Sequence, residues 1–129
     1  MSKRRKDVPS GRAISIQQPF VEMILNGKKK YEYRSRQTHI RGRVYLYASK
    51  NKARLIEHGH GVDRFARGVI VGSVEIVDCR EFDRGDYFGY KLRRPKRYKK
   101  HLKPKFQPQP CFFFPFEQKS SKKKRRKAS

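Results

Sequence analysis

A short apolar segment that ends at a glycine and is followed by an alternating charged segment limits what this chain can fold into. Phe20 and Ile24 fall on one face of a helix, because residues four positions apart are neighbours there. Pro19 suits the first helical turn, where its missing N–H is not needed. Gly27 can end the helix, because glycine adopts the left-handed conformation without a Cβ penalty. The sequence therefore predicts a short helix between Pro19 and Gly27.

The pattern changes to strict alternation after Gly27, which predicts a strand. Tyr31 and Tyr33 would lie on one face of this strand. The other face would carry Lys30, Glu32, Arg34 and Arg36. A carboxylate between cations has two interpretations, an ion-pair ladder on a solvated surface or a polar group at the mouth of a cleft beside the helix.

The charge of the chain limits its partners. The chain contains 35 Lys and Arg residues and 11 Asp and Glu residues, which gives a formal net charge of +24 over 129 residues. Such a chain attracts polyanions, of which nucleic acid is the usual one. An anionic membrane surface is the competitor, but no basic amphipathic helix and no run of about 18 apolar residues is present. We expect a nucleic-acid partner and no membrane.

Four segments, in this order, resemble the ASCH family (activating signal cointegrator homology). They are a strand with a Gln-Pro helix start at residues 13–20, the motif G-x-K-x-x-E-x-R at Gly27, Lys29, Glu32 and Arg34, a basic turn and strand at residues 41–50, and a Gly-bounded apolar strand at residues 68–79. A weaker fifth match lies at residues 110–116. The resemblance implies an α+β, mainly β fold, a small PUA-like β-barrel with a short flanking helix after the first strand.

The resemblance also implies a nucleic-acid or nucleoside cleft beside the helix. We expect its binding residues to be Gln18, Lys29, Glu32, Arg34, Arg36, Arg41 and Arg43. Lys29 and Arg34 would meet a phosphate or a base edge, and arginine can do so bidentately. Glu32 would orient Arg34 or accept a hydrogen bond from a base. Gln18 either caps the helix or turns its amide to the cleft. RNA is favoured over DNA.

An enzymatic function is the alternative to binding. Some bacterial members of the family are amidohydrolases acting on acetylated cytidine, in which a Thr nucleophile occupies the position of Glu32 and a Lys at the position of Lys29 activates it. Here the nucleophile is absent. Glu32 and Lys29 could still supply general acid–base chemistry to a ribonuclease or a nucleoside hydrolase. A further alternative is a structural component of a ribonucleoprotein.

Neither metal nor cofactor is expected. His58 and His60 flank Gly59, but two histidines with no third ligand nearby make a poor zinc site. Cys79 and Cys111 are too few for a disulfide framework and read as small, buried apolar residues of a protein in a reducing compartment. A signal-peptide pattern is absent, and we expect a cytoplasmic monomer.

The sequence predicts one domain with a basic extension on each side. Residues 1–12 form a basic arm, residues 13–118 the domain, and residues 119–129 a basic tail that we expect to be disordered. In a eukaryotic cell the run from Lys122 to Lys127 could act as a nuclear import signal. Both extensions would add salt-sensitive affinity.

Two later segments complete the predicted domain. Residues 91–105 carry nine Lys and Arg and no acid, interrupted by Pro95 and Pro104, which suits either a groove along a nucleic-acid backbone or a solvated loop. Cys111 and Phe113 belong to a last strand that would close the barrel.

Overall fold

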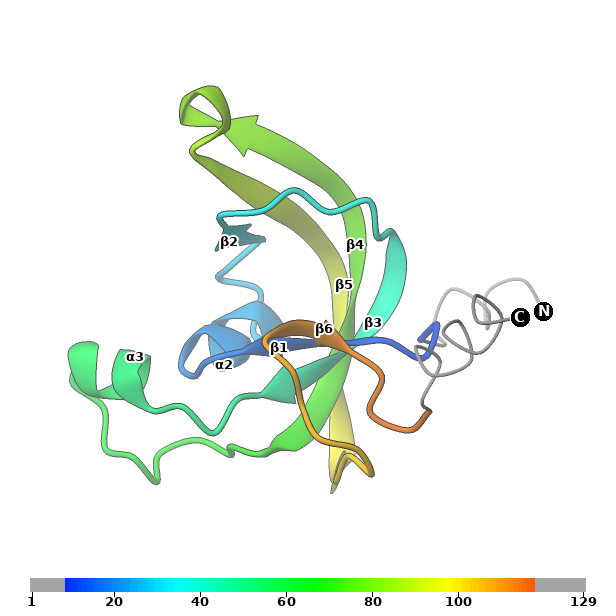
Figure 1. The fold of residues 1–129 in the computed structure, drawn as a ribbon. Coiled ribbons are helices and arrows are strands. Elements are labelled where there is room, and N and C mark those ends of the chain that lie inside the picture. The colour runs from blue at the N-terminus through cyan, green and yellow to red at the C-terminus, as the bar shows by residue number, and fades with distance from the viewer. Residues whose placement is uncertain (1–8, 118–129) are drawn as a thin grey trace.

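The computed structural model describes residues 9–117. The predicted basic tail at residues 119–129, its Lys122 to Lys127 run and most of the basic arm lie outside this part of the chain. Within it, one curved, six-stranded sheet forms the body of the protein, and the long β4 and β5 strands run side by side as a curved ribbon (Figure 1).

The elements follow the chain in a simple order. They are β1 (Ala13–Ile16), α2 (Phe20–Leu25), β2 (Tyr31–Arg34), β3 (Gly42–Ala48), α3 (Ala53–Glu57), β4 (Val69–Phe82), the 3₁₀ turn η1 (Asp83–Gly85), β5 (Tyr87–Leu102) and β6 (Cys111–Phe113). The strands are ordered β2-β5-β4-β3-β1-β6. All neighbours are antiparallel except β1 and β3, which run parallel. This mainly β fold with short helices confirms the fold class predicted from the sequence.

The predicted helix, glycine and strand are confirmed, although Pro19 is the N-cap of the helix and the strand ends at Arg34, before Arg36. Helix α2 buries Val21 and Ile24. Gly27 has a φ of +85°, and its N–H donates to the carbonyl of Ile24 at 3.1 Å. The N–H of Lys28 then donates to the Met23 carbonyl at 2.9 Å, so the last turn is satisfied without a side-chain cap. The chain leaves the helix with the geometry that starts β2.

The core has two parts, one on each face of the sheet. The larger contains Ile14, Ile16, Val21, Ile24, Val44, Leu46, Val74 and Ile76, all at most 1% exposed. Burying each such side chain stabilises the fold by about 1.5–3 kcal/mol. In the smaller cluster Tyr47 packs on Phe113 with ring centroids 5.3 Å apart, and Tyr45 packs on Phe116. The two tyrosines of β3 are therefore packing residues.

The basic segment at residues 91–105 is mostly strand. Residues 87–102 form β5, which pairs with β4 along its length and with β2 near its start. Pro95 is tolerated because the pairing shifts between Ser73 and Glu75, and Arg94 adopts a φ of +51° there. Residues 91–102 are therefore strand and not loop, because cross-strand pairing outweighed a composition poor in strand formers, although most of these residues are exposed to solvent as the solvated interpretation expected.

The expected closing strand exists, but it does not close the ladder. β6 pairs with β1, which leaves β2 and β6 as the two edges of an open sheet. Side chains bridge the opening instead. The hydroxyl of Tyr90 donates to the carbonyl of Arg36 at 2.7 Å, and the Tyr90 ring stacks on Phe112. The result is a barrel-like curve with a gap at one side.

Candidate nucleic-acid interface

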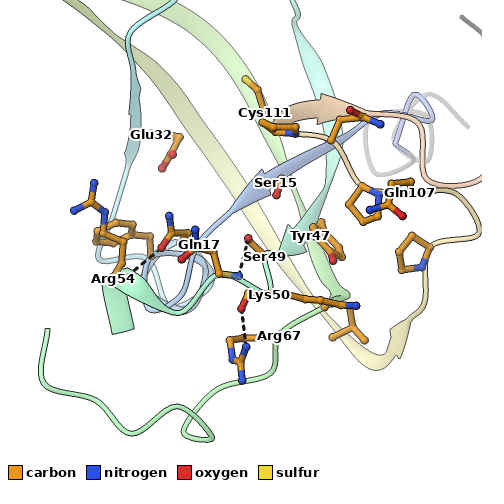
Figure 2. A pocket seen from close by; sticks show the side chains of 18 of the residues that line it. Ser15, Gln17, Glu32, Tyr47, Ser49, Lys50, Arg54, Arg67, Gln107 and Cys111 are labelled. Atoms are coloured by element: carbon orange, nitrogen blue, oxygen red, sulfur yellow. Dashed lines mark hydrogen bonds between the residues drawn. The ribbon is translucent and has the colours of Figure 1, made fainter. Parts of the chain in front are cut away.

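A cleft of about 1030 Å³ opens where the ladder is not closed. The segment at residues 103–111 forms one wall of this cleft. The ends of β1 and β3 form its floor, and β2 with the start of α3 forms the other wall. Figure 2 shows Ser15, Gln17, Ser49 and Glu32 lying around this space. The cleft exists because β2 and β6 are not hydrogen-bonded to each other.

Glu32 lies between two cations at the wall of the cleft. One carboxylate oxygen is 3.7 Å from Nζ of Lys29, and the other accepts a hydrogen bond of 2.8 Å from Nε of Arg34. Glu32 is only 6% exposed. Of the two interpretations of this alternating segment, burial supports the cleft, because a solvated ion-pair ladder would leave the carboxylate in water.

Arg34 also links the two sides of the opening. Its Nη2 donates to the carbonyl of Ser15 on β1 at 2.6 Å, while its Nε is held by Glu32. The guanidinium lines the cleft with its plane fixed at two points. Glu32 therefore orients Arg34, one of the two roles expected for it from the sequence.

Lys29 stands behind the cleft rather than in its lining. Its Nζ lies 5.1 Å from the ring centroids of both Phe20 and Tyr33 and contacts Glu32. The two rings and the carboxylate hold the ammonium group at the junction of α2 and β2. Lys29 thus adds positive charge to the site through its position near the wall.

Gln18 does not face the cleft, contrary to the interpretation we favoured from the sequence. Its side chain is 2% exposed, and both ends of the amide are used inside the protein. The carbonyl oxygen accepts the N–H of Glu22 at 3.0 Å, and the amide nitrogen donates to the carbonyl of Ala66 at 3.0 Å. The alternative of a helix-capping role is the one the structure shows, since Glu22 lies in the first turn of α2.

The three remaining predicted arginines do not line the cleft either. Arg36 and Arg41 are exposed on the β2–β3 connection, and Nη1 of Arg41 donates to the carbonyls of Thr38 and Ile40. Arg43 is 5% exposed. It donates to Oγ of Ser73 at 2.8 Å and to the carbonyl of Arg94 at 2.7 Å. Because side chains alternate along β3, Arg43 lies on the face of the sheet opposite Val44, where it reaches β4 and β5.

The structure adds cations to the site that we did not predict. They are Lys50, Arg54, Arg67, Lys103 and Lys105. Arg67 is fixed by hydrogen bonds from its guanidinium to the carbonyls of Lys50 and Val62, whereas Lys103 and Lys105 are exposed at the rim. The basic composition of residues 91–105 pointed to the last two. Nothing local in the sequence marked Arg67, which reaches the cleft through a loop.

The cleft lining within residues 9–117 is strongly cationic. It contains six Lys or Arg side chains and one carboxylate, that of Glu32. Polar groups without charge, such as Ser15, Ser49 and Gln107, lie between the cations. Burial raises the pKa of Tyr47 above its ordinary value. The arrangement offers charge for phosphates and hydrogen-bond donors for sugars or base edges.

His58, His60 and the two cysteines have packing roles. His58 packs edge-on against Phe20, and His60 against Phe65. Among residues 9–117 no group of three or more His, Cys, Asp or Glu side chains could hold a metal ion. Cys79 and Cys111 are free and half-buried against the larger core rather than fully buried.

Burial, and then the adjacent Cys111, raises the pKa of Tyr90.

No helix in the described part of the chain is long and apolar enough to cross a membrane.

Comparison with known proteins gives a family match and a fold match. The family model described as "ASCH domain" matches residues 14–123. The crystal structure of ASCH from Zymomonas mobilis has a TM-score of 0.57 at 14% identity, over 89% of this chain and 93% of that chain. Crystal structures of two mutants of that protein have TM-scores of 0.58 and 0.57, at 14% and 13% identity, over 92% and 89% of this chain and 98% and 96% of theirs. No curated protein matches this chain.

Proposed function

This chain belongs to the ASCH domain family, and on that premise we propose that it binds nucleic acid, with RNA preferred to DNA, in the cationic cleft at the opening of the sheet. The observation that carries the proposal is the composition of this cleft, six cations around one compensated carboxylate. Nucleic-acid affinity arises mainly from contacts between Lys or Arg and phosphates. A net charge of +24 on the whole chain favours the same partner.

The position of each cation suggests its role. Arg34 is held at Nε and Nη2 by Glu32 and Ser15, so Nη1 can reach a phosphate or a base edge from a fixed plane. Lys103 and Lys105 lie at the rim of the wall opposite Arg34, where they would contact the phosphates of the nucleic acid. The basic extensions outside residues 9–117 would add affinity that carries no sequence information.

The preference for RNA rests on the uncharged polar groups of the floor. Ser15, Gln17 and Ser49 lie within the lining, between the two cationic walls (Figure 2). A ribose 2′-hydroxyl can both donate and accept hydrogen bonds, and it is the group by which proteins distinguish RNA from DNA. Hydroxyl and amide side chains at this depth are suitable partners for it.

A hydrolytic function has weaker support. Its base would be Glu32, but both carboxylate oxygens already face cations, Lys29 at 3.7 Å and Arg34 at 2.8 Å. A carboxylate with both oxygens engaged by cations orients those cations, and it is poorly placed to accept a proton from a substrate. We therefore favour binding over catalysis, and a ribonuclease assay with Glu32→Gln tests the alternative, which requires that activity be present in the wild type and lost in the variant.

The test of the binding function compares two pairs of lysines in the full chain. Lys103→Ala with Lys105→Ala removes two charges from the cleft rim. Lys99→Ala with Lys100→Ala removes two exposed charges from β5 outside the cleft and serves as the control. Fluorescence anisotropy would measure affinity for single- and double-stranded RNA and DNA over a range of salt concentrations.

We expect the rim variant to bind more weakly and with a shallower salt dependence than the control. Each single-strand phosphate contact contributes about 0.7 to the slope of log K against log salt, so two lost contacts change it by about 1.4. The tails contribute equally to both variants and cancel in the comparison. Equal weakening of both variants would show that charge alone, and not the cleft, determines binding. Arg34→Ala is less informative, because this side chain also links β2 to β1.

A further inference from the structure

Four aromatic rings form a continuous surface beside the cleft, where β2 meets the β4–β5 hairpin. We call this group, Tyr31, Tyr33, Phe82 and Tyr87, the aromatic platform. Tyr33 lies 6.0 Å from Tyr31 in a stacked arrangement, 5.9 Å from Phe82 and 5.8 Å from Tyr87, by ring centroids. Phe82 and Tyr87 are stacked at 5.3 Å. Tyr33 also lines the cleft, so the two surfaces are continuous.

The platform lies over a glycine that leaves room for it. A Cβ at Gly89 would come within 2.8 Å of Phe82, 3.0 Å of Tyr31 and 3.1 Å of Tyr33. Gly89 is the cross-strand partner of Tyr33 in β5. The missing side chain lets the rings settle onto the backbone of the sheet. Neighbouring strands therefore hold the aromatic faces at fixed positions.

Two of the four platform rings, Tyr33 and Tyr87, are exposed to solvent. Tyr33 is 50% exposed and Tyr87 is 37% exposed. Among residues 9–117, the third exposed large hydrophobic side chain is Ile56, on α3 and apart from this group. Aromatic groups exposed as a patch, rather than singly, mark an interaction surface.

The charge around the platform identifies the kind of partner. Nζ of Lys29 lies 5.1 Å from the centroid of Tyr33, and Lys91 is the cross-strand partner of Tyr31. The turn at the end of the hairpin exposes Arg84 together with Asp83 and Asp86, so the cations flank the platform mainly on the side of Tyr31 and Lys29. Cations interleaved with exposed aromatic rings suit an anionic, aromatic ligand, which describes a strand of nucleic acid with unpaired bases.

We propose that the aromatic platform binds unpaired bases of single-stranded nucleic acid by stacking on Tyr87 and Tyr33, while the backbone continues into the cleft. The proposal rests on the proposed function and specifies its substrate as single-stranded. Bases in a duplex are stacked on each other and cannot reach the rings. A splayed single strand can place successive bases on side chains of this kind.

The main test uses Tyr87, which belongs to the platform and not to the cleft lining. Tyr87→Leu keeps an apolar group against Phe82 and removes the aromatic face, whereas Tyr87→Phe keeps the ring. Ile56→Ala is the control for loss of an exposed apolar side chain. Anisotropy with the full chain would use an unstructured RNA oligonucleotide and a blunt RNA duplex of the same length.

We expect Tyr87→Leu to weaken single-strand binding by roughly 5- to 150-fold, the usual range for one stacked base. Tyr87→Phe and Ile56→Ala should bind like the wild type, and duplex binding should not change in any variant. A second measurement needs no variant. Irradiation of the wild type with RNA containing 4-thiouridine should attach the base to Tyr33 or Tyr87, located by mass spectrometry of peptides.

The outcomes separate the two proposals. If the wild type binds no nucleic acid, the proposed function fails. If it binds and the rim lysines matter, but Tyr87→Leu leaves single-strand affinity unchanged and the photoadducts lie elsewhere, the platform proposal is overturned while the cleft stands. Equal losses on single strand and duplex would also overturn it.

Discussion

Replacing Arg43 by alanine separates a structural arginine from a binding one. The sequence placed Arg43 among the nucleic-acid contacts. In the structure it is buried on one face of the sheet and only 5% exposed. From β3 it donates to the Ser73 hydroxyl on β4 and to the Arg94 carbonyl on β5. It therefore joins three strands at the point where the β5 backbone is distorted.

The expected loss of stability follows from these contacts. A hydrogen bond from a charged donor contributes about 1.5–3 kcal/mol, and the Ser73 hydroxyl, on a fully buried residue, would be left without this partner. Loss of both hydrogen bonds lowers the free energy of unfolding by about 3 kcal/mol or more. The melting temperature of a domain of this size should fall by at least about 10 °C.

The measurement is urea unfolding followed by far-UV circular dichroism, because the chain has no tryptophan and a guanidinium salt would screen its charge. Arg36→Ala is the matched control, since it removes the same charge from an exposed side chain and should change stability by less than about 0.5 kcal/mol. The folded Arg43→Ala protein should bind RNA with unchanged affinity. A variant as stable as the control, or one that is folded but binds poorly, would refute this assignment.

Two further predictions address packing and pH. Gly72→Ala should destabilise the protein by at least about 2 kcal/mol, because its Cβ would lie 2.3 Å from the backbone oxygen of Lys96. Gly61→Ala, where a Cβ meets nothing within 4 Å, is the control for the same denaturation experiment, and equal stabilities would contradict the reasoning. Burial raises the pKa of Tyr45, Tyr47 and Tyr90, so the unfolded chain, with tyrosines near pKa 10, loses these protons first. The stability is then complete below about pH 10 and falls as the pH rises beyond it. Absorbance at 295 nm should show the buried phenolates forming together with loss of the circular dichroism signal. Ionisation of all seven tyrosines near pH 10 in a folded protein would contradict this.

The local structure around the helix could be predicted because it depends on neighbouring residues. The helical spacing of Phe20 and Ile24, the left-handed position of Gly27 and the alternation of Tyr31 and Glu32 are properties of short segments. The motif that carries Glu32 and Arg34 also placed both on one face of a strand. For this reason the sequence identified one wall of the cleft.

The arginines show where local patterns fail. Arg36, Arg41 and Arg43 lie within eight positions of one another, but the structure puts two in solvent and one inside the sheet. A basic residue in a strand points to water or to the core according to its register with partner strands. That register is fixed by residues such as Ser73 and Arg94, which are distant in the sequence.

By itself, the sequence determined the elements with a clear period, the cationic character of the chain and the family to which it belongs. Only the tertiary structure decided that residues 91–102 form strand, that the sheet stays open between β2 and β6, and that residues 103–111 face Arg34 across a cleft. The physical reason is the range of the interactions. Helix caps and alternation involve neighbours a few residues apart, whereas strand pairing, the opening of the sheet and the aromatic platform join segments that meet only once the chain has folded.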